Sequence, residues 1–341
     1  MSKIRLGIVG CGGMTDNHEM GFHSLQDICE VTATCDIIES RAERMAKAVG
    51  AGYYTTDYKT MTDYVDAVLV VLPHQLHFEC GMFFLEHDKH VLMEKPLCNT
   101  EEECLTLADT AKERDLILMC AYPVRYWKGI AKLKELLDSG EYGEIYQMSI
   151  WTEQYTDTEN LPWVASAKNL GGGQLFSHGC HYIDLLLWFL GEPISGVHFG
   201  TNKGTPWMER EGNSNVILTF ENNVMAYHFG TWGARGTTHD YDFQVFTDKG
   251  FFEYNRATSK LIYRQDLGPN PGDAREIVWD FRDSSKQTQY ENRHFLECIL
   301  EHKKPLTDAY SAIQSLRVIW KLYEAEENNC IADLRGLGLP K

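Results

Sequence analysis

Short apolar runs alternate with amphipathic segments through the first third of the chain. The runs at 4–9, 31–35, 67–72, 90–93 and 116–121 have the length of strands, and helical spacing of apolar positions lies between several of them. Because a run that is apolar at nearly every position marks a strand buried on both faces, these runs predict a parallel sheet. The intervening helices are expected to cover both faces of that sheet.

Several helices in this part have recognisable ends. Residues 76–86 carry a helical pattern, and Thr100 precedes the next helix. The Thr100 hydroxyl can accept from the N–H of Glu103 while the Glu103 carboxylate reaches back, which forms a capping box. A short amphipathic helix at 130–137 is expected to end at Gly140.

Beyond residue 142 the pattern becomes that of β-strands. Six runs recur at the spacing of a meander: 145–152, 197–200, 215–221, 224–230, 241–247 and 250–254. The turn at 220–224, in which Asn223 can adopt positive φ, and the turn at 248–250 predict hairpins. This part is therefore expected to hold a mostly antiparallel sheet.

Three helices and one polar segment complete the later part. A helix at 181–190 is ended by Gly191, and helices at 290–301 and 309–326 close the chain. The polar segment 266–286 predicts a loop over the sheet, which either lines a site or is an ordinary surface excursion.

The length of 341 residues suggests two domains. The change of pattern divides them into an α/β domain at 1–122 and an α+β domain at 123–341. The closing helices can pack back on the first domain.

A glycine turn follows the first strand directly, as Gly10-Cys11-Gly12-Gly13-Met14-Thr15. Gly10 permits a tight turn, Gly12 lets the backbone approach a pyrophosphate, and the next helix points its free N–H groups at the phosphates. We expect Gly10, Gly12, Gly13 and Met14 to contact a dinucleotide in a Rossmann fold. Thr15 replaces the third glycine of the motif, so helix and strand are expected to pack a little further apart.

Asp36 ends the second strand, where an acidic residue can accept hydrogen bonds from both hydroxyls of an adenosine ribose. A 2′-phosphate there would meet a like charge, so NAD is favoured over NADP. Arg41 nearby softens that preference. A Rossmann-like turn without a cofactor is the alternative interpretation.

Glu94-Lys95-Pro96 falls at the carboxyl end of a parallel strand, the edge where doubly wound sheets bind ligands. The proline restricts Lys95 to an extended conformation. Lys95 can then stabilise negative charge on a substrate oxygen, and Glu94 can anchor the lysine or the nicotinamide ribose. Taken alone, the motif is better explained by a surface lysine in a strand-to-helix turn.

The glycine run 171–173 allows a close backbone approach, which we expect to be to a substrate or the nicotinamide. A second cluster of polar residues follows this run. His181 and Asp184 are three residues apart near the expected helix start, so they share a face. Histidine titrates near neutral pH and suits proton removal from an alcohol. His178 is the alternative base. The alternative interpretation of His181 is a purely structural role at the helix start.

Together these motifs resemble the Gfo/Idh/MocA oxidoreductase family, over nearly the whole chain. The residues that carry the resemblance are Gly10, Gly12, Asp36, Pro73, His77, Glu94, Lys95, Pro96, Arg125, Gly171, Gly172, Gly173, His181, Asp184 and Gly191. The resemblance implies that Lys95 is the catalytic lysine and that His181 is the catalytic histidine. It also implies that Pro73 and His77 lie beside the nicotinamide.

The resemblance further implies that Tyr122 and Arg125 lie at the junction of the two domains and contact substrate. It implies a large open sheet in the second domain, which pairs with further copies as a homodimer or homotetramer. Many polyol-oxidising members have an aspartate four residues before the catalytic histidine, where this chain has Ser177. A hydroxyl orients an imidazole less firmly than a carboxylate, so His181 is expected to be a weaker base or to depend on His178 or Asp184.

Aromatic and polar side chains near these motifs can line a carbohydrate site or belong to the core. Trp163 is the one taken as a substrate contact. The other candidates are Trp127, Trp151, Glu153, Tyr155, Trp232 and His239.

Composition and charge limit the classes of molecule that the protein is expected to bind and the compartment in which it is expected to lie. The net charge of −17 argues against nucleic acid and anionic membranes. The first strand begins too early for a signal peptide, no run is long enough to span a bilayer, and the ten cysteines include no C-x-x-C pair, which predicts a cytoplasmic protein. The spacing of His178, Cys180 and His181 matches no zinc pattern, so no metal is expected.

These observations favour an NAD-dependent oxidoreductase that acts on a secondary alcohol of a sugar, sugar derivative or cyclitol. A redox-neutral enzyme that keeps its NAD and oxidises substrate only transiently, with elimination or glycoside cleavage, is the alternative. A non-catalytic dinucleotide sensor is the third hypothesis, which the presence of Lys95 and His181 disfavours.

Overall fold

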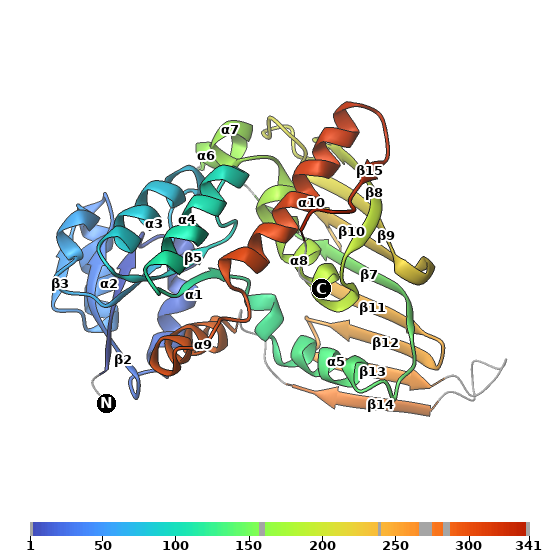
Figure 1. The fold of residues 1–341 in the computed structure, drawn as a ribbon, viewed down its shortest axis with the longest axis horizontal. Helices are drawn as coiled ribbons and strands as arrows, with labels where there is room; N and C mark the ends of the chain where they lie inside the picture. Colours follow the sequence, from blue (N-terminus) through green and yellow to red (C-terminus); the bar gives the residue numbers. More distant parts are fainter. Residues whose placement is uncertain (1–2, 157–160, 238–239, 266–274, 282–286, 339–341) are drawn as a thin grey trace. The chain divides into compact units, whose positions relative to one another are not determined.

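The chain forms two compact units in the computed structural model, which describes residues 3–156, 161–237, 240–265, 275–281 and 287–338. The first unit consists of Met1–Tyr126 and Lys286–Ile313, and the second consists of Trp127–Ser285 and Gln314–Lys341. Figure 1 shows the elements of both units along the chain.

The first unit contains a six-stranded parallel sheet in the order β3-β2-β1-β4-β5-β6. Its strands are β1 (Ile4–Val9), β2 (Cys29–Cys35), β3 (Tyr53–Thr55), β4 (Ala67–Val70), β5 (His90–Glu94) and β6 (Leu118–Ala121). This is the strand order of a Rossmann fold. The parallel sheet predicted from the apolar runs is confirmed, and β3 is an additional strand.

Helices connect these strands and cover both faces of the sheet (Figure 1). They are α1 (Gly13–Phe22), α2 (Glu39–Val49), α3 (His77–Glu86), α4 (Glu101–Glu113) and α9 (Thr288–Glu301), with short turns η1 (Tyr58–Met61), η2 (His74–Leu76) and η3 (Pro123–Tyr126). Thr100 and Glu103 form both bonds of the predicted capping box at the start of α4.

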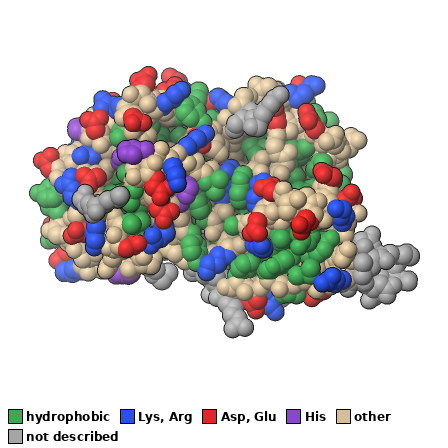
Figure 2. Space-filling model, turned by 60° about the horizontal axis from the view of Figure 1, so that its bottom comes forward, with side chains coloured by type: hydrophobic (Ala, Val, Ile, Leu, Met, Phe, Trp, Pro, Cys, Tyr) green, Lys and Arg blue, Asp and Glu red, His purple; other side chains and the backbone are tan. Residues whose placement is uncertain are grey.

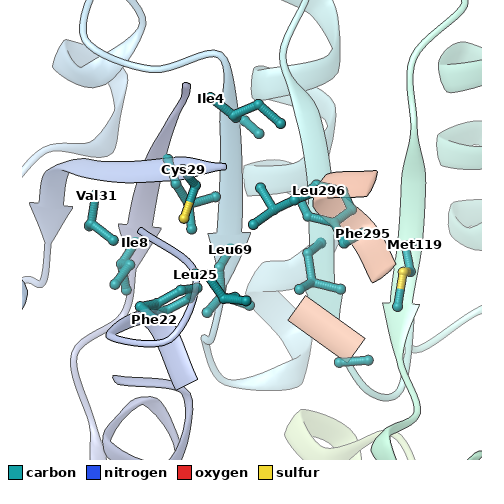
Figure 3. Packing of buried hydrophobic residues seen from close by; sticks show 14 of the residues in the cluster. Ile4, Ile8, Phe22, Leu25, Cys29, Val31, Leu69, Met119, Phe295 and Leu296 are labelled. Atoms are coloured by element: carbon teal, nitrogen blue, oxygen red, sulfur yellow. The ribbon is translucent and has the colours of Figure 1, made fainter. Parts of the chain in front are cut away.

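The core of this unit packs on the two faces of the sheet. On one face, Phe295 and Leu296 of α9 lie with Phe22 of α1 against strand residues such as Ile8 and Leu69 (Figure 3).

On the other face α3 and α4 approach β5 closely. A Cβ on Gly81 would lie 2.7 Å from Met93 Cε and 3.1 Å from a methyl carbon of Leu107. Tight packing on both faces holds the carboxyl ends of the strands in fixed register.

The second unit contains a nine-stranded sheet in the order β14-β13-β12-β11-β7-β10-β9-β8-β15. Its strands are β7 (Ile145–Glu153), β8 (Pro193–Thr201), β9 (Asn213–Phe220), β10 (Met225–Thr231), β11 (Tyr241–Thr247), β12 (Gly250–Asn255), β13 (Lys260–Gln265), β14 (Arg275–Asp280) and β15 (Ala332–Asp333). All neighbours are antiparallel except β10 and β7. The prediction of a large, mostly antiparallel sheet is confirmed.

The helical elements of the second part of the chain are α5 (Lys128–Asp138), α6 (Pro162–Ala165), α7 (Ala167–Leu170), the π turn η4 (Leu175–Gly179), α8 (Cys180–Leu190), the turn η5 (Glu221–Asn223) and α10 (Ala309–Glu327). Asn222 and Asn223 both adopt positive φ in the turn before β10, as predicted for Asn223.

Two local predictions were wrong. The expected loop at 266–286 contains β14, while residues 266–274 and 282–286 lie outside the described part of the chain. The helix expected to start at His181 begins earlier, because the π turn η4 precedes α8 without a break. Side chains from distant segments hold this turn, so the local pattern did not indicate it.

One face of the nine-stranded sheet is covered by α5, α8 and α10 (Figure 1). Gly129 of α5 lies against the ring of Tyr254, and Gly196 of β8 lies against Leu218 and Leu322. The other face exposes Phe199 at 69%, Ile217 at 46% and Met225 at 48% of their surface. Figure 2 shows that hydrophobic side chains also gather on the surface in the right-hand half of the view.

Among the described helices, none is both long enough and apolar enough to cross a bilayer. Nine of the ten cysteines are buried and all ten carry free thiols.

Candidate active site

The glycine loop has the backbone geometry that its motif predicts. Gly10 has φ +92°, and a Cβ there would lie 2.0 Å from the Val71 carbonyl oxygen, so only glycine fits. At Gly12 and Gly13, no atom of the described residues lies within 4 Å of a Cβ position, apart from the chain neighbours and the helix's own backbone. Gly12 is the extended N-cap of α1, so open space adjoins the free N–H groups of the helix start. Such a cradle fits a pyrophosphate.

Thr15 occupies the third glycine position without being exposed. Its side chain is fully buried, and its hydroxyl donates to the Gly10 carbonyl oxygen at 2.6 Å. Arg44 of α2 donates to the Cys11 carbonyl oxygen at 3.1 Å and pairs with Asp16 at 2.9 Å. These bonds fix the loop from both sides.

Asp36 stands at the end of β2 with both carboxylate oxygens facing the same edge of the sheet as the loop. Oδ2 accepts from the Cys11 N–H at 2.9 Å and Oδ1 accepts from the Ile38 N–H at 2.8 Å. Each oxygen keeps a further lone pair, so the carboxylate can still accept from ribose hydroxyls. Ile37 beside it is 89% exposed, which leaves an apolar surface for an adenine ring. The residues present therefore fit a dinucleotide.

Pro73 and His77 lie beyond the end of β4. Pro73 is partly exposed and precedes η2, and His77 is fully buried. His77 Nδ1 lies 2.9 Å from the Pro96 carbonyl oxygen, and its Nε2 lies 2.9 Å from that of Leu72. The ring thus ties together the loops that follow β4 and β5.

Lys95 directly follows β5, and its peptide bond to Pro96 is cis. Glu94 is buried, and its Oε2 accepts from the Lys95 N–H at 3.1 Å. Its Oε1 lies 3.1 Å from Nε2 of the fully buried His18, and Nδ1 of His18 lies 3.1 Å from Asn292 Oδ1. The motif is therefore anchored from inside by α1 and α9.

A second buried carboxyl lies close to this network. Burial raises the pKa of Glu291 well above its ordinary value, and the charge of Glu94 raises it further. Burial also raises the pKa of Glu94, but the hydrogen bond and charge of His18 and the charge of Lys95 outweigh this and leave it lowered. The pKa values of the two carboxyls are therefore shifted in opposite directions, which favours the charged form of Glu94 and the neutral form of Glu291. Neither carboxyl oxygen of Glu291 has a hydrogen-bond partner among the described residues.

Tyr122 and Arg125 lie near the end of the first stretch of the first unit and are both buried. Arg125 donates to the Leu306 carbonyl oxygen at 3.2 Å and to the Ser311 hydroxyl at 3.4 Å. These bonds join the chain around η3 to the segment that connects α9 and α10 and to the first turn of α10.

The candidate residues of the second unit lie on one continuous helical segment. Ser177 and His178 belong to the π turn η4, and His181 and Asp184 belong to the start of α8. The ring centroids of His178 and His181 are 5.9 Å apart. The amide nitrogen of Gln174 lies 3.3 Å from His178 Nδ1. Ser177, His181 and Asp184 are each more than nine-tenths buried.

Aromatic rings surround this segment. Tyr241 and Trp232 lie 5.8 Å and 6.5 Å from the His178 ring, and Tyr182 stacks on Tyr241 at 6.0 Å. Trp163 packs in the cluster that contains Trp232.

Of the other aromatic candidates, one adjoins the rings around His178 and another packs elsewhere on the sheet. Trp127 lies 6.2 Å from Tyr241 and so adjoins the same ring cluster, whereas Trp151 packs on Tyr227 at 6.0 Å. His239 lies outside the described residues.

The glycine run before this segment makes its close contacts with the protein's own side chains. A Cβ on Gly173 would lie 2.2 Å from the Glu211 carboxyl carbon, and one on Gly172 would lie 2.6 Å from Phe176 Cβ and 3.0 Å from the Tyr323 ring. Sequence reasoning assigned these glycines to a ligand and did not find Glu211 or Tyr323.

The residues that sequence reasoning missed come from distant parts of the chain. His18, Glu291 and Asn292 support the lysine motif, and Glu211 and Tyr323 support the histidine segment. For the helical residues among these, a buried polar side chain on a helix was the only available signal, and Glu211 precedes β9 without such a pattern. Within the described ranges, no group of three or more histidine, cysteine or acidic side chains is arranged to hold a metal ion.

Comparison with known proteins identifies the family. The model of the oxidoreductase family with an NAD-binding Rossmann fold matches residues 4–122, and the GFO/IDH/MocA C-terminal domain matches residues 130–253. Together they span more than half of the chain. The chain therefore belongs to the Gfo/Idh/MocA family of oxidoreductases, as its motifs predicted.

Individual relatives are dehydrogenases of sugars and cyclitols. The chain is 30% identical to D-glucoside 3-dehydrogenase of Escherichia coli (strain K12) over 56% of this chain and 55% of that protein. It is 24% identical to scyllo-inositol 2-dehydrogenase (NAD(+)) of Bacillus subtilis (strain 168) over 93% and 92% of the two chains. A solved structure of levoglucosan dehydrogenase in complex with NADH and levoglucosan shares the fold, with a TM-score of 0.89 and 18% identity over 98% of this chain and 100% of that one.

Proposed function

We propose that this protein oxidises a secondary alcohol of a sugar, sugar derivative or cyclitol with NAD as the hydride acceptor. The observation that carries the proposal is the open cradle at Gly12 and Gly13, beside Asp36. Strand β5 of the same sheet ends at Glu94, directly before Lys95. When bound, NAD supplies the hydride-accepting carbon.

The chain's own residues handle the oxygen and the proton. Lys95 donates a hydrogen bond to the substrate oxygen and stabilises its developing negative charge. His181 removes the hydroxyl proton. Ser177, His178 and Asp184 share the helical segment of His181 and contact the substrate hydroxyls. Tyr122, Arg125 and Trp163 are further proposed substrate contacts.

Asp36 supports NAD over NADP. Its carboxylate is fixed by two backbone N–H groups and would face a 2′-phosphate with like charge. A relative from Haloarcula marismortui is named D-xylose 1-dehydrogenase [NADP(+)], so the family includes members with the other preference. Gly10, Gly12, Gly13, Met14, Pro73, His77 and Glu94 complete the proposed cofactor site.

The substrate class rests on relatives and on the rings near His178. Relatives are named for a glucoside, an inositol and levoglucosan. The rings of Tyr241 and Trp232 provide flat apolar faces of the kind that pack against sugar C–H groups.

We also propose a cytoplasmic homo-oligomer. Buried free thiols are typical of a reducing compartment. The exposed side chains of Phe199, Ile217 and Met225 lie on three adjacent strands, which gives a self-complementary apolar face for a second copy.

Two variants test the proposed roles. Lys95→Ala is expected to lower kcat by about 10²–10³-fold, and His181→Ala by about 10²–10⁴-fold. The Kd for NAD, measured by fluorescence titration, should stay within a few-fold in both. Loss of NAD affinity without a change in kcat would contradict these roles.

A further inference from the structure

The helical segment that carries His178 and His181 has an unusual N-terminus. A helix start leaves backbone N–H groups without partners inside the helix. Here Tyr323 Oη accepts from the N–H groups of Gly173 at 3.1 Å and Phe176 at 3.3 Å, and Glu211 Oε1 accepts from that of Leu175 at 3.1 Å. Helix caps normally come from an adjacent residue, whereas these acceptors lie on distant segments.

The two acceptors hold each other in place. The Tyr323 hydroxyl donates to Glu211 Oε1 at 2.6 Å, and both side chains are buried. The Arg210 guanidinium lies 3.7 Å from the centre of the Tyr323 ring, and its Nε lies 3.3 Å from Glu211 Oε2. The backbone N–H of Gln174 also donates to the Glu211 carbonyl oxygen at 2.8 Å. Both acceptors, the Tyr323 hydroxyl and the Glu211 carboxylate, are therefore held in fixed positions by contacts of their own.

The glycine run matches this arrangement. Because the Glu211 carboxyl carbon would lie 2.2 Å from a Cβ on Gly173, the carboxylate can reach the Leu175 N–H only past a glycine. The segment is thus built around Glu211 and Tyr323.

We propose that Glu211 and Tyr323 form a clamp that holds the π turn η4 open and thereby sets the orientation of His178 relative to His181. The proposal rests on the catalytic role proposed for His181. A π turn contains one residue more than the α-helical turn it replaces. Relaxation to a regular helix shifts the two histidines by one position, which rotates one ring about the helix axis by about 100° relative to the other. Glu211 and Tyr323 are positioning residues, since they act through the helix.

Tyr323→Phe tests the clamp because it removes one hydroxyl and three hydrogen bonds but keeps the ring. We expect kcat to fall between about tenfold and a hundredfold, with the KM for NAD unchanged. Tyr263→Phe is the matched control, because its buried hydroxyl donates to the Lys249 carbonyl oxygen at 2.9 Å, in the same unit but away from the π turn. Glu211→Gln keeps an oxygen that can accept from Leu175, so it should retain more activity than Glu211→Ala.

A readout that does not depend on turnover separates this proposal from the function on which it rests. In histidine-labelled protein, the imidazole NMR resonances of His178 and His181, assigned by His→Gln variants, should move in Tyr323→Phe and stay in Tyr263→Phe. Unchanged resonances in Tyr323→Phe would overturn the clamp. Resonances that move while kcat stays the same would support the clamp and count against the catalytic role of His181.

The clash at Gly173 supplies a second test. Gly173→Ala alone should move the same resonances, because its methyl group displaces the Glu211 carboxylate. In the presence of Glu211→Ala, the added methyl group should have little further effect on kcat, as expected for residues in contact. Fully additive losses in kcat would contradict the clamp.

Discussion

Nε2 of His18 lies 3.1 Å from Oε1 of Glu94, with both side chains buried. His18 sits on α1, the helix whose first N–H groups face the open cradle, and Glu94 precedes Lys95. The cofactor loop and the lysine motif are therefore joined through one hydrogen bond inside the Rossmann unit. A substitution that removes this hydrogen bond is therefore expected to affect both the cofactor loop and the lysine motif.

His18→Leu should destabilise the protein strongly. It leaves the buried Glu94 carboxylate without this side-chain partner, although the Lys95 N–H still donates to it, and the loss costs about 3–5 kcal/mol. His198→Leu is the matched control, since His198 is as buried and pairs with Glu326 at 2.9 Å, but that carboxylate is 27% exposed and can take up water instead. The His198→Leu variant should lose about 1–3 kcal/mol of its free energy of unfolding. If urea unfolding shows that the two variants lose the same free energy of unfolding, the buried pair of His18 and Glu94 contributes no more than the partly exposed pair of His198 and Glu326.

Glu291→Gln should change how stability depends on pH. Because burial raises the pKa of Glu291 in the folded state above its ordinary 4.5, the unfolded chain releases this proton first as pH rises. The stabilisation is complete below about pH 4.5 and declines as pH rises toward the folded-state pKa. The free energy of unfolding falls by ~1.4 kcal/mol for each pH unit between the unfolded-state and folded-state pKa.

The amide in Glu291→Gln has no proton to release, so the variant should gain stability relative to the wild type as pH rises above about 4.5. Thermal unfolding at several pH values measures this gain. Glu297→Gln, on the same helix at a side chain that is 45% exposed, should follow the wild type. Parallel curves for all three proteins would mean that Glu291 is not held neutral.

Asp36→Asn should weaken the preference for NAD. The amide keeps one oxygen that can accept from the backbone but loses the negative charge that opposes a 2′-phosphate. We expect the ratio of kcat/KM for NAD to that for NADP to fall at least about tenfold, which equals ~1.4 kcal/mol. An unchanged ratio would assign the preference to residues other than Asp36.

Ile217→Asp should dissociate the proposed oligomer. Ile217 is 46% exposed on the uncovered face of the nine-stranded sheet, and a carboxylate there would be buried by a second copy. Light scattering after size-exclusion chromatography should show a smaller mass than for the wild type. Tyr54→Asp, at a similarly exposed residue of the first unit, is the control. A wild-type mass for both variants would exclude this face.

Local sequence patterns predicted the elements whose ends and burial are locally determined. The apolar run of β1, the capping box of Thr100 and Glu103, and the hairpin turn at Asn223 all agree with the structure. The short edge strand β15 has only two residues. β14 has no buried position, and its apolar run Ile277-Val278-Trp279 is too short to stand out in a polar segment.

Local sequence patterns could not predict the residues that hold the candidate site in place. The π turn depends on Tyr323, which is 150 residues from Gly173, and Glu94 depends on His18 and on the α9 residue Asn292. A single buried glutamate or tyrosine in the sequence does not indicate which backbone group it will meet. The glycine run was accordingly interpreted as a ligand contact, although the nearest atoms belong to Glu211 and Tyr323.

The most direct test of the proposed function is the absorbance at 340 nm of purified protein mixed with NAD+ or NADP+ and a panel of sugars, sugar acids and inositols. The proposal predicts growth of NADH with NAD+ and one class of these substrates, with a lower kcat in Lys95→Ala. A flat trace with every substrate, from a protein that retains NAD through purification, would contradict net oxidation and favour transient, redox-neutral chemistry.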